Sequence, residues 1–258
     1  MIDKTKKELY LEIEQCTKKL RLPETRKNFK EVAKDSNIQD LSYENFLYIL
    51  LTKEYKQRLI NAEKNRIRNA EFPFKKYLED LNIEDLPEDG RKKYKILKTL
   101  DFIKENQNVI LAGNPGTGKS HIAIGLGIKA CMEGYKVWFT TIPQLINQLK
   151  ECRSEQILRR FENRFMKYDL IIADELGYIS FDKEGAELLF THLSMRTGRK
   201  STIITTNLSF DRWEEIFQDP VMTAAMVDRL THKSYLVNMN GNSYRYKETK
   251  EWLDKNGL

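Results

Sequence analysis

The chain has 258 residues, with 44 Lys and Arg against 38 Asp and Glu, a formal net charge of +6 and a hydrophobic content of 40%. This composition excludes a disordered chain, and the length allows two domains with packed cores. No run of about 18 apolar residues occurs and no apolar segment follows the polar start, so we predict neither a membrane span nor a signal peptide. Three cysteines without CxxC spacing and three isolated histidines indicate a reduced, cytoplasmic protein without a structural metal.

The first part of the chain is predicted to be helical. Residues 4–70 contain no glycine, and the first apolar stripe at helical spacing is Leu9, Ile13, Cys16 and Leu20. The longest helix is expected to start after Ser42 as N-cap and to reach about Ala70. Residues 83–90 are acidic and include a proline and a glycine, so we interpret them as a linker. The expected domains are therefore an all-α domain over residues 1–82 and a second domain over residues 83–258.

Beyond the linker, short β-rich runs alternate with helical segments. The predicted strands span residues 108–112, 136–140, 170–174, 201–205 and 234–238. The predicted helices span residues 119–132, 143–150, 154–166, 183–196, 212–217 and 220–230. Continuous apolar strands separated by helices are typical of a parallel sheet that is buried on both faces. We therefore predict an α/β fold for this domain.

A phosphate-binding loop follows the first of these strands. The motif GxxxxGK[ST] is formed by Gly113, Asn114, Pro115, Gly116, Thr117, Gly118, Lys119 and Ser120, and His121 continues into a predicted helix. Glycines let the backbone N–H groups point at phosphate oxygens, Lys119 supplies a cation for the β and γ phosphates, and Ser120 offers a hydroxyl to Mg²⁺. We expect residues 113–121 to bind a nucleotide.

An acidic pair, Asp174 and Glu175, ends a later apolar strand. By themselves two such acids are most often a turn or a helix N-cap. With a phosphate loop upstream, we expect Asp174 to hold the magnesium ion and Glu175 to act as general base towards the attacking water.

Polar residues after the next strand and two arginines are further candidates. Thr206 and Asn207 could sense the γ phosphate, although Asn207 could instead cap the helix before Arg212. Arg229 and Arg245 could deliver guanidinium groups to the phosphates, or be surface ion pairs, Arg229 with the neighbouring Asp228.

The basic half of the long N-terminal helix could bind DNA. At about 100° per residue, Lys53, Lys56, Lys64 and Arg68 fall within an arc of roughly 120°, which Ile60 shares. The same pattern would suit a solvated helix face. No base-reading motif is present, so any contact should be to the phosphate backbone and should depend on salt.

The sequence resembles the IstB-like transposition helper ATPases, members of the AAA+ group that also contains DnaC-like helicase loaders. The stretches that carry this resemblance are LSYENFLYILLTKEYKQR, NVILAGNPGTGKSHIAIGLGIKAC, DLIIADELGY, TTNLSF, DRLTH and GNSYR. They extend from about Leu20 to Tyr246 and so cover nearly the whole chain.

The resemblance implies a role for each motif. Residues 113–120 would be the Walker A loop, Asp174 and Glu175 the Walker B pair, and Asn207 the sensor-one residue. Arg229 would be an arginine finger acting on a neighbouring subunit, with Arg212 as the other candidate, and Arg245 a sensor-two-like arginine. The resemblance also implies the strand order 5-1-4-3-2. Because only about 50 residues follow Asn207, we expect no full lid domain and an ATP site shared between subunits of a homo-oligomer.

Four functions remain open at this point. The expected function is an ATPase that uses ATP and Mg²⁺, assembles on double-stranded DNA and delivers it to a transposase. The alternative within the same group is a replicative helicase loader. A small-molecule kinase would need an arginine-rich lid, and no such segment is recognisable. A nucleotide switch without turnover would have no use for Glu175 as a general base.

Overall fold

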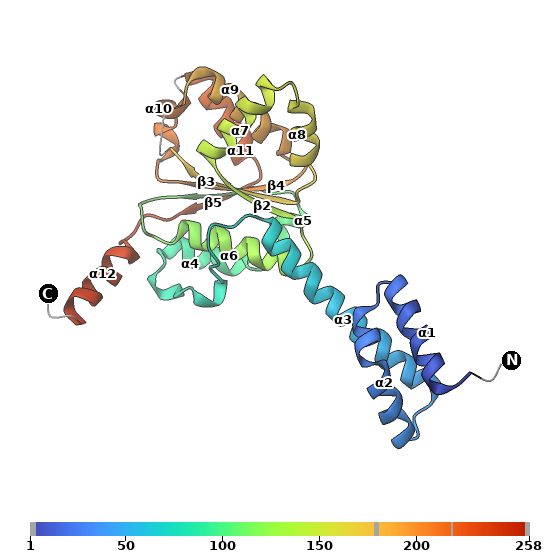
Figure 1. The fold of residues 1–258 in the computed structure, drawn as a ribbon. Helices are drawn as coiled ribbons and strands as arrows, with labels where there is room; N and C mark the ends of the chain where they lie inside the picture. Colours follow the sequence, from blue (N-terminus) through green and yellow to red (C-terminus); the bar gives the residue numbers. More distant parts are fainter. Residues whose placement is uncertain (1–3, 178–180, 218, 256–258) are drawn as a thin grey trace. The chain divides into compact units, whose positions relative to one another are not determined.

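The computed structural model describes residues 4–177, 181–217 and 219–255, and the chain divides into two compact units, residues 1–65 and 66–258 (Figure 1). Tyr178, the last residue of the DLIIADELGY stretch, lies outside the described residues. In the described part, no helix combines the length and apolar character that crossing a bilayer requires.

The first unit consists of α1 (Lys6–Lys19), α2 (Pro23–Ile38) and most of α3 (Tyr43–Asn69). Its small core contains Phe29, Val32 and Leu50, and the ring of Tyr10 meets that of Phe29 edge-on at 5.4 Å. The predicted stripe on α1 is wrong except at Ile13, because Leu9, Cys16 and Leu20 are exposed. The inward face is instead Tyr10, Ile13 and Thr17, which also follows helical spacing.

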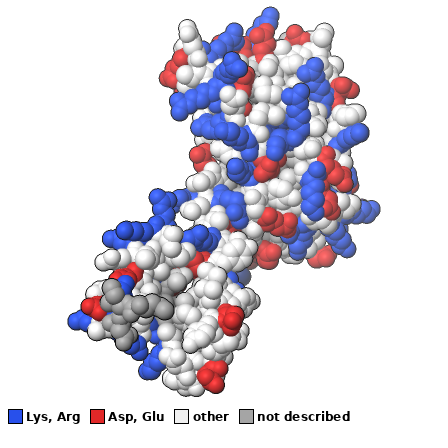
Figure 2. Space-filling view, turned by 90° about the vertical axis from the view of Figure 1, so that its right-hand side faces the viewer, with Lys and Arg blue, Asp and Glu red and all other residues white. Residues whose placement is uncertain are grey.

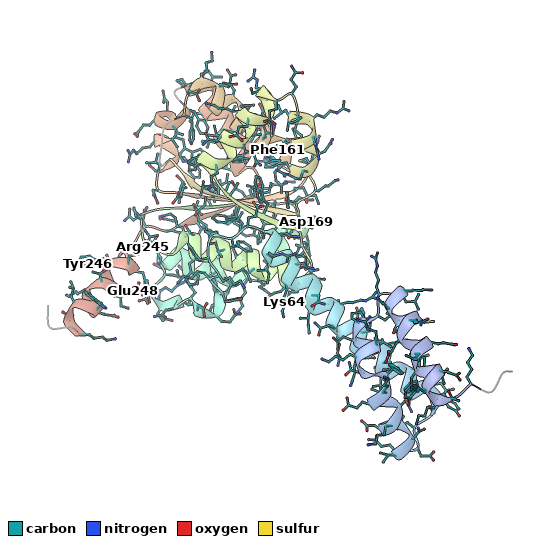
Figure 3. The ribbon with its side chains drawn as sticks, in the orientation of Figure 1. Lys64, Phe161, Asp169, Arg245, Tyr246 and Glu248 are labelled. Carbon is teal, nitrogen blue, oxygen red and sulfur yellow. The ribbon has the colours of Figure 1, made fainter. Side chains whose placement is uncertain are left out.

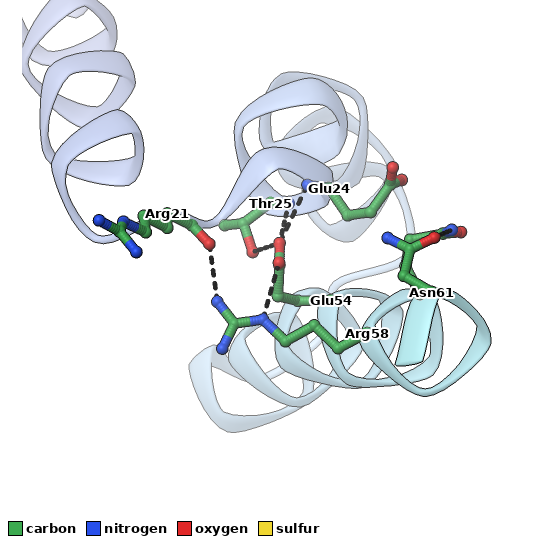
Figure 4. A network of polar contacts seen from close by, with 7 residues as sticks. Arg21, Glu24, Thr25, Glu54, Arg58 and Asn61 are labelled. Carbon is green, nitrogen blue, oxygen red and sulfur yellow. Dashed lines mark hydrogen bonds and ion pairs between the residues drawn. The ribbon is translucent and has the colours of Figure 1, made fainter. Parts of the chain in front are cut away.

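A buried carboxylate joins α2 to α3 in this unit (Figure 4). Glu54 is only 4% exposed, and its Oε2 accepts hydrogen bonds from the backbone N–H groups of Glu24 (2.9 Å) and Thr25 (3.0 Å). The first turn of α2 has no side-chain cap of its own, so Glu54 satisfies donors that would otherwise lack partners. Arg58 pairs with Glu54 and donates to the carbonyl of Arg21 at 2.7 Å.

The second unit contains a five-stranded parallel sheet in the order β2-β3-β4-β1-β5. The strands are β1 (Val109–Ala112), β2 (Val137–Thr141), β3 (Leu170–Leu176), β4 (Ser201–Thr206) and β5 (Tyr235–Asn238). The predicted order 5-1-4-3-2 is the same order read from the opposite edge. The expectation of an α/β fold with an AAA+-type sheet is therefore confirmed.

Helices cover both faces of this sheet (Figure 1). On one face lie α4 (Glu88–Leu97) and α6 (Lys119–Met132), and α5 (Asp101–Lys104) packs into the same core. On the other face lie α7 (Ile142–Ser154), α8 (Leu158–Phe165), α9 (Lys183–Arg196), α10 (Glu214–Phe217) and α11 (Pro220–Thr231). Alternation along β1 explains the two cores, since Val109 and Leu111 enter the first and Ile110 enters the second.

Three short 3-10 turns and a last helix complete this unit. They are η1 (Leu78–Asp80), η2 (Ile83–Asp85), η3 (Phe210–Arg212) and α12 (Tyr244–Lys255). The predicted helix over residues 212–217 is thus split into η3 and α10. In the described residues after β5, α12 is the one helix present.

The division between the units falls within α3, earlier than the expected boundary after residue 82. Ala70 and Leu78 are buried in the core beneath the sheet, and Arg66 Nε donates to the carbonyl of Cys131 at 2.6 Å. Residues 66–82 therefore belong to the second unit. The expected linker over residues 83–90 is likewise folded, as η2 and the start of α4.

Both outer strands of the sheet are met by groups from outside it. On β2, Phe139 N donates to the carbonyl of Ala70 at 2.8 Å. On β5, Asn238 N donates to a carboxylate oxygen of Asp89 at 2.7 Å, and Lys93 donates to the carbonyl of Leu236.

Candidate functional site

The phosphate loop connects β1 to α6, and its glycines are required by close neighbours. Gly116 has φ +80°, and a Cβ there would lie 2.1 Å from Ser243 Oγ. At Gly113 a Cβ would lie 2.2 Å from the backbone carbonyl carbon of Met239. The segment after β5 therefore packs directly on the loop, and side chains at these two positions would separate them.

Lys119 is buried at the start of α6. Its Nζ donates to the carbonyls of Gly113 and Asn114, each at 2.7 Å. Burial lowers the pKa of Lys119 to about 8, helped by the positive charge of Arg245 and opposed by the negative charge of Asp174. The ammonium group thus lies in a site with little compensating negative charge, which favours an incoming anion.

Asp174 contacts the phosphate loop through Ser120. Ser120 Oγ donates to Asp174 Oδ1 at 3.0 Å, and Thr205 Oγ1 donates to the same oxygen. Asp174 is only 6% exposed, and no cationic side chain forms an ion pair with it among the described residues. A buried carboxylate next to a hydroxyl, with no counter-ion of its own, fits a hard cation such as Mg²⁺.

Glu175 is turned out of the sheet by an irregularity in β3. The pairing of β3 with β4 shifts register between Ala173 and Leu176, and Glu175 adopts φ +67°, an uncommon conformation for a residue other than glycine. Its backbone N–H donates to Thr205 Oγ1 at 3.0 Å. The side chain is exposed and faces the cavity, where a carboxylate can reach a bound water.

A cavity of about 410 Å³ lies next to these side chains; Asp174 is not among its lining residues. The loop residues 115–121, Glu175, Thr206 and Asn207 line it. Asn207 is half-buried, whereas the hydroxyl of Thr206 accepts a hydrogen bond from Leu208 N. Of the two sensor candidates, Asn207 has the freer polar side chain towards the cavity.

Sequence reasoning missed the opposite wall of the cavity. It is formed by Phe74, Lys76, Asp80, Leu81, Asn82, Asp85 and Leu86. The sequence instead predicts that these residues belong to the helical domain and the linker. His121 reaches this wall, with Nε2 2.9 Å from the carbonyl of Tyr77. Thr205, which contacts both acids, was also missed, and its place beside them follows only once β4 is known to pair with β3.

The start of α12 also borders the cavity, and Figure 3 labels Arg245 and Glu248 on this helix. Arg245 lines it, together with Tyr244 and Glu248. Tyr244 N donates to the carbonyl of Gly116 at 2.9 Å. Lys247 forms an ion pair with Asp85 of η2, with 2.7 Å between Nζ and Oδ1.

The two finger candidates differ in their partners. Arg212 forms an ion pair with Glu215, with Nε–Oε1 2.9 Å and Nη2–Oε2 3.0 Å. Arg229 is exposed on α11, lies outside the cavity lining, and places its guanidinium carbon 4.9 Å from the ring centre of Phe190. The ion pair with Asp228 considered from the sequence does not form.

The four basic residues considered for DNA binding are all exposed: Lys53, Lys56 and Lys64 in the first unit and Arg68 in the second. Ile60 is itself 44% exposed, so this part of α3 faces solvent. Figure 2 shows Lys and Arg spread over the face that it presents, with Asp and Glu between them, so no single basic patch dominates that view.

Comparison with known proteins assigns the chain to a family. Residues 15–252 match the family of IstB-like ATP-binding proteins. The chain belongs to this family. One relative, from Pseudomonas aeruginosa, carries the name of an ATP-binding protein of insertion sequence IS21. The two chains are 34% identical over 240 residues, which cover 93% of this chain and 91% of the relative. A Geobacillus stearothermophilus relative named for insertion sequence IS5376 and ATP binding is 33% identical over 232 residues, or 90% and 92% of the two chains.

Solved structures share the fold of this IstB-family chain. DnaI matches with a TM-score of 0.53 and 18% identity, over 70% of this chain and 92% of that one. AMPPCP-bound DnaA from Aquifex aeolicus matches with a TM-score of 0.55 and 20% identity, over 71% of this chain and 56% of that one. At these identities the likeness concerns the fold alone.

Proposed function

We propose that this IstB-family protein is an ATPase that assembles on double-stranded target DNA and delivers it to the transposase of its insertion sequence. The observation that carries the proposal is the contact between Asp174 and Ser120 at the end of the phosphate loop, with Glu175 facing the same cavity. The names of the relatives support the link to insertion sequences.

In this proposal, ATP binds with its phosphates on the loop backbone, and Lys119 leaves its carbonyl partners to contact the β and γ phosphates. Ser120 and Asp174 would hold Mg²⁺, which neutralises charge on the phosphate oxygens when bound. Glu175 accepts the proton of the attacking water, and the amide of Asn207 orients that water.

The two arginines have different roles. Arg245 lines the cavity of its own chain, so it contacts the phosphates in cis. Arg229 lies outside that cavity and forms no ion pair with an acid in the described part of the chain, whereas Arg212 is held by Glu215. We therefore assign the finger to Arg229, which would act on ATP bound by a neighbouring subunit. Hydrolysis then requires a homo-oligomer.

The experiment that tests this function measures ATP hydrolysis and particle size with and without double-stranded DNA. The unchanged protein should form large particles only with ATP and DNA together, and DNA should raise its hydrolysis rate. Lys119→Ala should neither bind ATP nor assemble. Glu175→Gln keeps the side-chain shape but loses the base, so it should bind ATP, hydrolyse it roughly 10²–10⁴-fold more slowly and stay longer on DNA.

Two results would contradict the proposal. Unimpaired hydrolysis by Glu175→Gln would remove Glu175 as the base. If DNA has no effect on assembly and a replicative helicase induces it, the helicase-loader function would be favoured instead.

A further inference from the structure

Arg229 lies over an aromatic ring, that of Phe190. The guanidinium carbon of Arg229, on α11, lies 4.9 Å from the ring centre of Phe190, on α9. This distance is well within the range of a cation–π interaction. No acidic side chain lies within ion-pair distance of Arg229 among the described side chains, and no hydrogen bond from its guanidinium is formed there.

Two other arginines show how this contact differs. Arg212 has its N–H groups bound to both carboxylate oxygens of Glu215. Arg196 also lies over a ring, 5.2 Å from the centre of Phe165, but it is fully buried and donates to backbone carbonyls, including those of Phe165 and Ser201. In both, the donors are already used. At Arg229 the Phe190 ring is the contact that the guanidinium makes among the described side chains, and a ring takes none of its N–H donors in hydrogen bonds to oxygen.

We propose that Phe190 is a positioning residue for the arginine finger: its ring supports the guanidinium group of Arg229 and leaves the N–H donors available for the γ phosphate of a neighbouring subunit's nucleotide. This inference rests on the proposed function, since it needs Arg229 to act in trans. An aromatic ring has no oxygen acceptor, so it does not compete with phosphate for the N–H donors of a guanidinium, whereas a carboxylate would.

Phe190 is suited to this role because it lies within α9 and packs against the core. It is partly buried and packs against the core between the sheet and α7–α11. An arginine side chain alone samples many rotamers, and ordering it costs conformational entropy at the moment of reaction. Contact with this ring orders part of the side chain before the neighbour binds.

The test compares Phe190→Leu with Phe190→Tyr in the DNA-stimulated ATPase assay. Leucine fills most of the volume but has no π face, so we expect kcat to fall about two- to fivefold, the range for an exposed cation–π contact. KM should change little, because an arginine finger stabilises the charge of the transition state more than it binds ATP in the ground state. Phe190→Tyr keeps the ring and should keep the parent kcat. Thermal unfolding of both variants checks that they fold.

Arg229→Ala provides the reference. If Phe190 acts through Arg229, adding Phe190→Leu to Arg229→Ala should cause no further loss. Two results would overturn the positioning role and leave the finger intact. One is that Phe190→Leu lowers kcat by the same factor in the Arg229→Ala background as in the parent. The other is that Phe190→Leu has the kcat of the parent while Arg229→Ala is impaired. If Arg229→Ala hydrolyses ATP as fast as the parent, Arg229 is not the arginine finger, and the inference about Phe190 is wrong as well.

Discussion

Lys119 shows how a single side chain prepares the site for an anion. Its ammonium group is held by two backbone carbonyls inside the loop, and burial lowers its pKa to about 8. A phosphate next to Nζ would raise that pKa, because it stabilises the charged form. Binding of ATP and protonation of Lys119 are therefore linked.

This linkage predicts a pH dependence of ATP affinity. Below pH 8 Lys119 is mostly charged before ATP arrives, and affinity should be nearly constant. Above pH 8 the free protein loses the proton that the complex retains, so affinity should fall by up to about tenfold per pH unit and binding should take up a proton. Titration calorimetry at pH 8.5 in buffers of different ionisation enthalpy measures that uptake.

Lys119→Arg is the matched control, because a guanidinium does not titrate in this range. If it binds ATP, it should do so without taking up a proton. Equal proton uptake by Lys119→Arg and the parent would assign the effect to another group.

Sequence reasoning located the residues of this site that belong to contiguous motifs. The loop and the Asp174–Glu175 pair could be found because local spacing alone identifies them. Local spacing does not identify the site residues that only tertiary structure brings together. Thr205 lies at the site because β4 pairs with β3, and Phe74 and Asn82 because their segment folds against the cavity.

At the scale of elements, one ion pair links the two helical segments that border the cavity. Lys247 of α12 and Asp85 of η2 are 2.7 Å apart, and the hydrogen bond from Lys247 lowers the pKa of Asp85. The same α12 carries Arg245 into the cavity. The pair therefore helps to hold Arg245 in place before ATP binds.

We predict that Asp85→Lys or Lys247→Glu alone weakens ATP binding about two- to fivefold, within the range of exposed ion pairs, and that the double charge swap restores it. Affinity for a fluorescent ATP analogue measures the effect. The pair of Glu88 and Lys92 on α4 lies outside the cavity lining and provides the control, since swapping its charges should leave affinity unchanged. Failure of the double swap to recover binding would argue against a link through charge.

The basic residues of α3 lead to a second prediction at this scale. Replacing Lys53, Lys56, Lys64 and Arg68 together by Ala should weaken binding to every DNA sequence alike. The logarithm of the binding constant falls linearly with the logarithm of the salt concentration, with a slope of about −0.9 per neutralised phosphate. Loss of four such contacts should make this slope less steep by about three to four units. Fluorescence anisotropy over a salt series gives the slope. An unchanged slope would mean that DNA does not contact these side chains.

At the scale of the whole molecule, the position of the boundary between the units predicts which fragment can fold. A fragment of residues 66–258 keeps Ala70 and Leu78 in the core, and it keeps Glu71, whose carboxylate accepts from Trp138 Nε1 at 2.9 Å. A fragment of residues 83–258 loses all three.

Loss of one buried Leu side chain costs about 2–5 kcal/mol, and 1 kcal/mol shifts the Tm of a domain of this size by about 2–4 °C. We therefore expect the fragment of residues 83–258 to melt about 10 °C or more below that of residues 66–258, or to aggregate. Calorimetry of both fragments decides. Equal melting temperatures would restore the boundary after residue 82.

The fold class could be predicted from the alternation of strands and helices along the sequence. The strand order could be predicted from the family resemblance. The boundary between the two units could not be predicted from the sequence. Residues 66–82 read as the end of a helix and an irregular segment, and only contacts with distant residues such as Cys131 and Phe139 assign them to the second unit. An acidic stretch with Pro87 and Gly90 is typical of a linker, but here it is held by tertiary contacts.

The groups that meet β2 and β5 limit how copies of this protein can join. An open strand edge is a template on which another chain can add a strand, and such growth is hard to reverse. Here backbone groups at Phe139, Leu236 and Asn238 already have partners from outside the sheet. If copies of this protein assemble as we propose, these groups favour contacts through side chains and loops over strand addition. Contacts of that kind can be broken one subunit at a time, so the proposed assembly could be dismantled and its subunits used again.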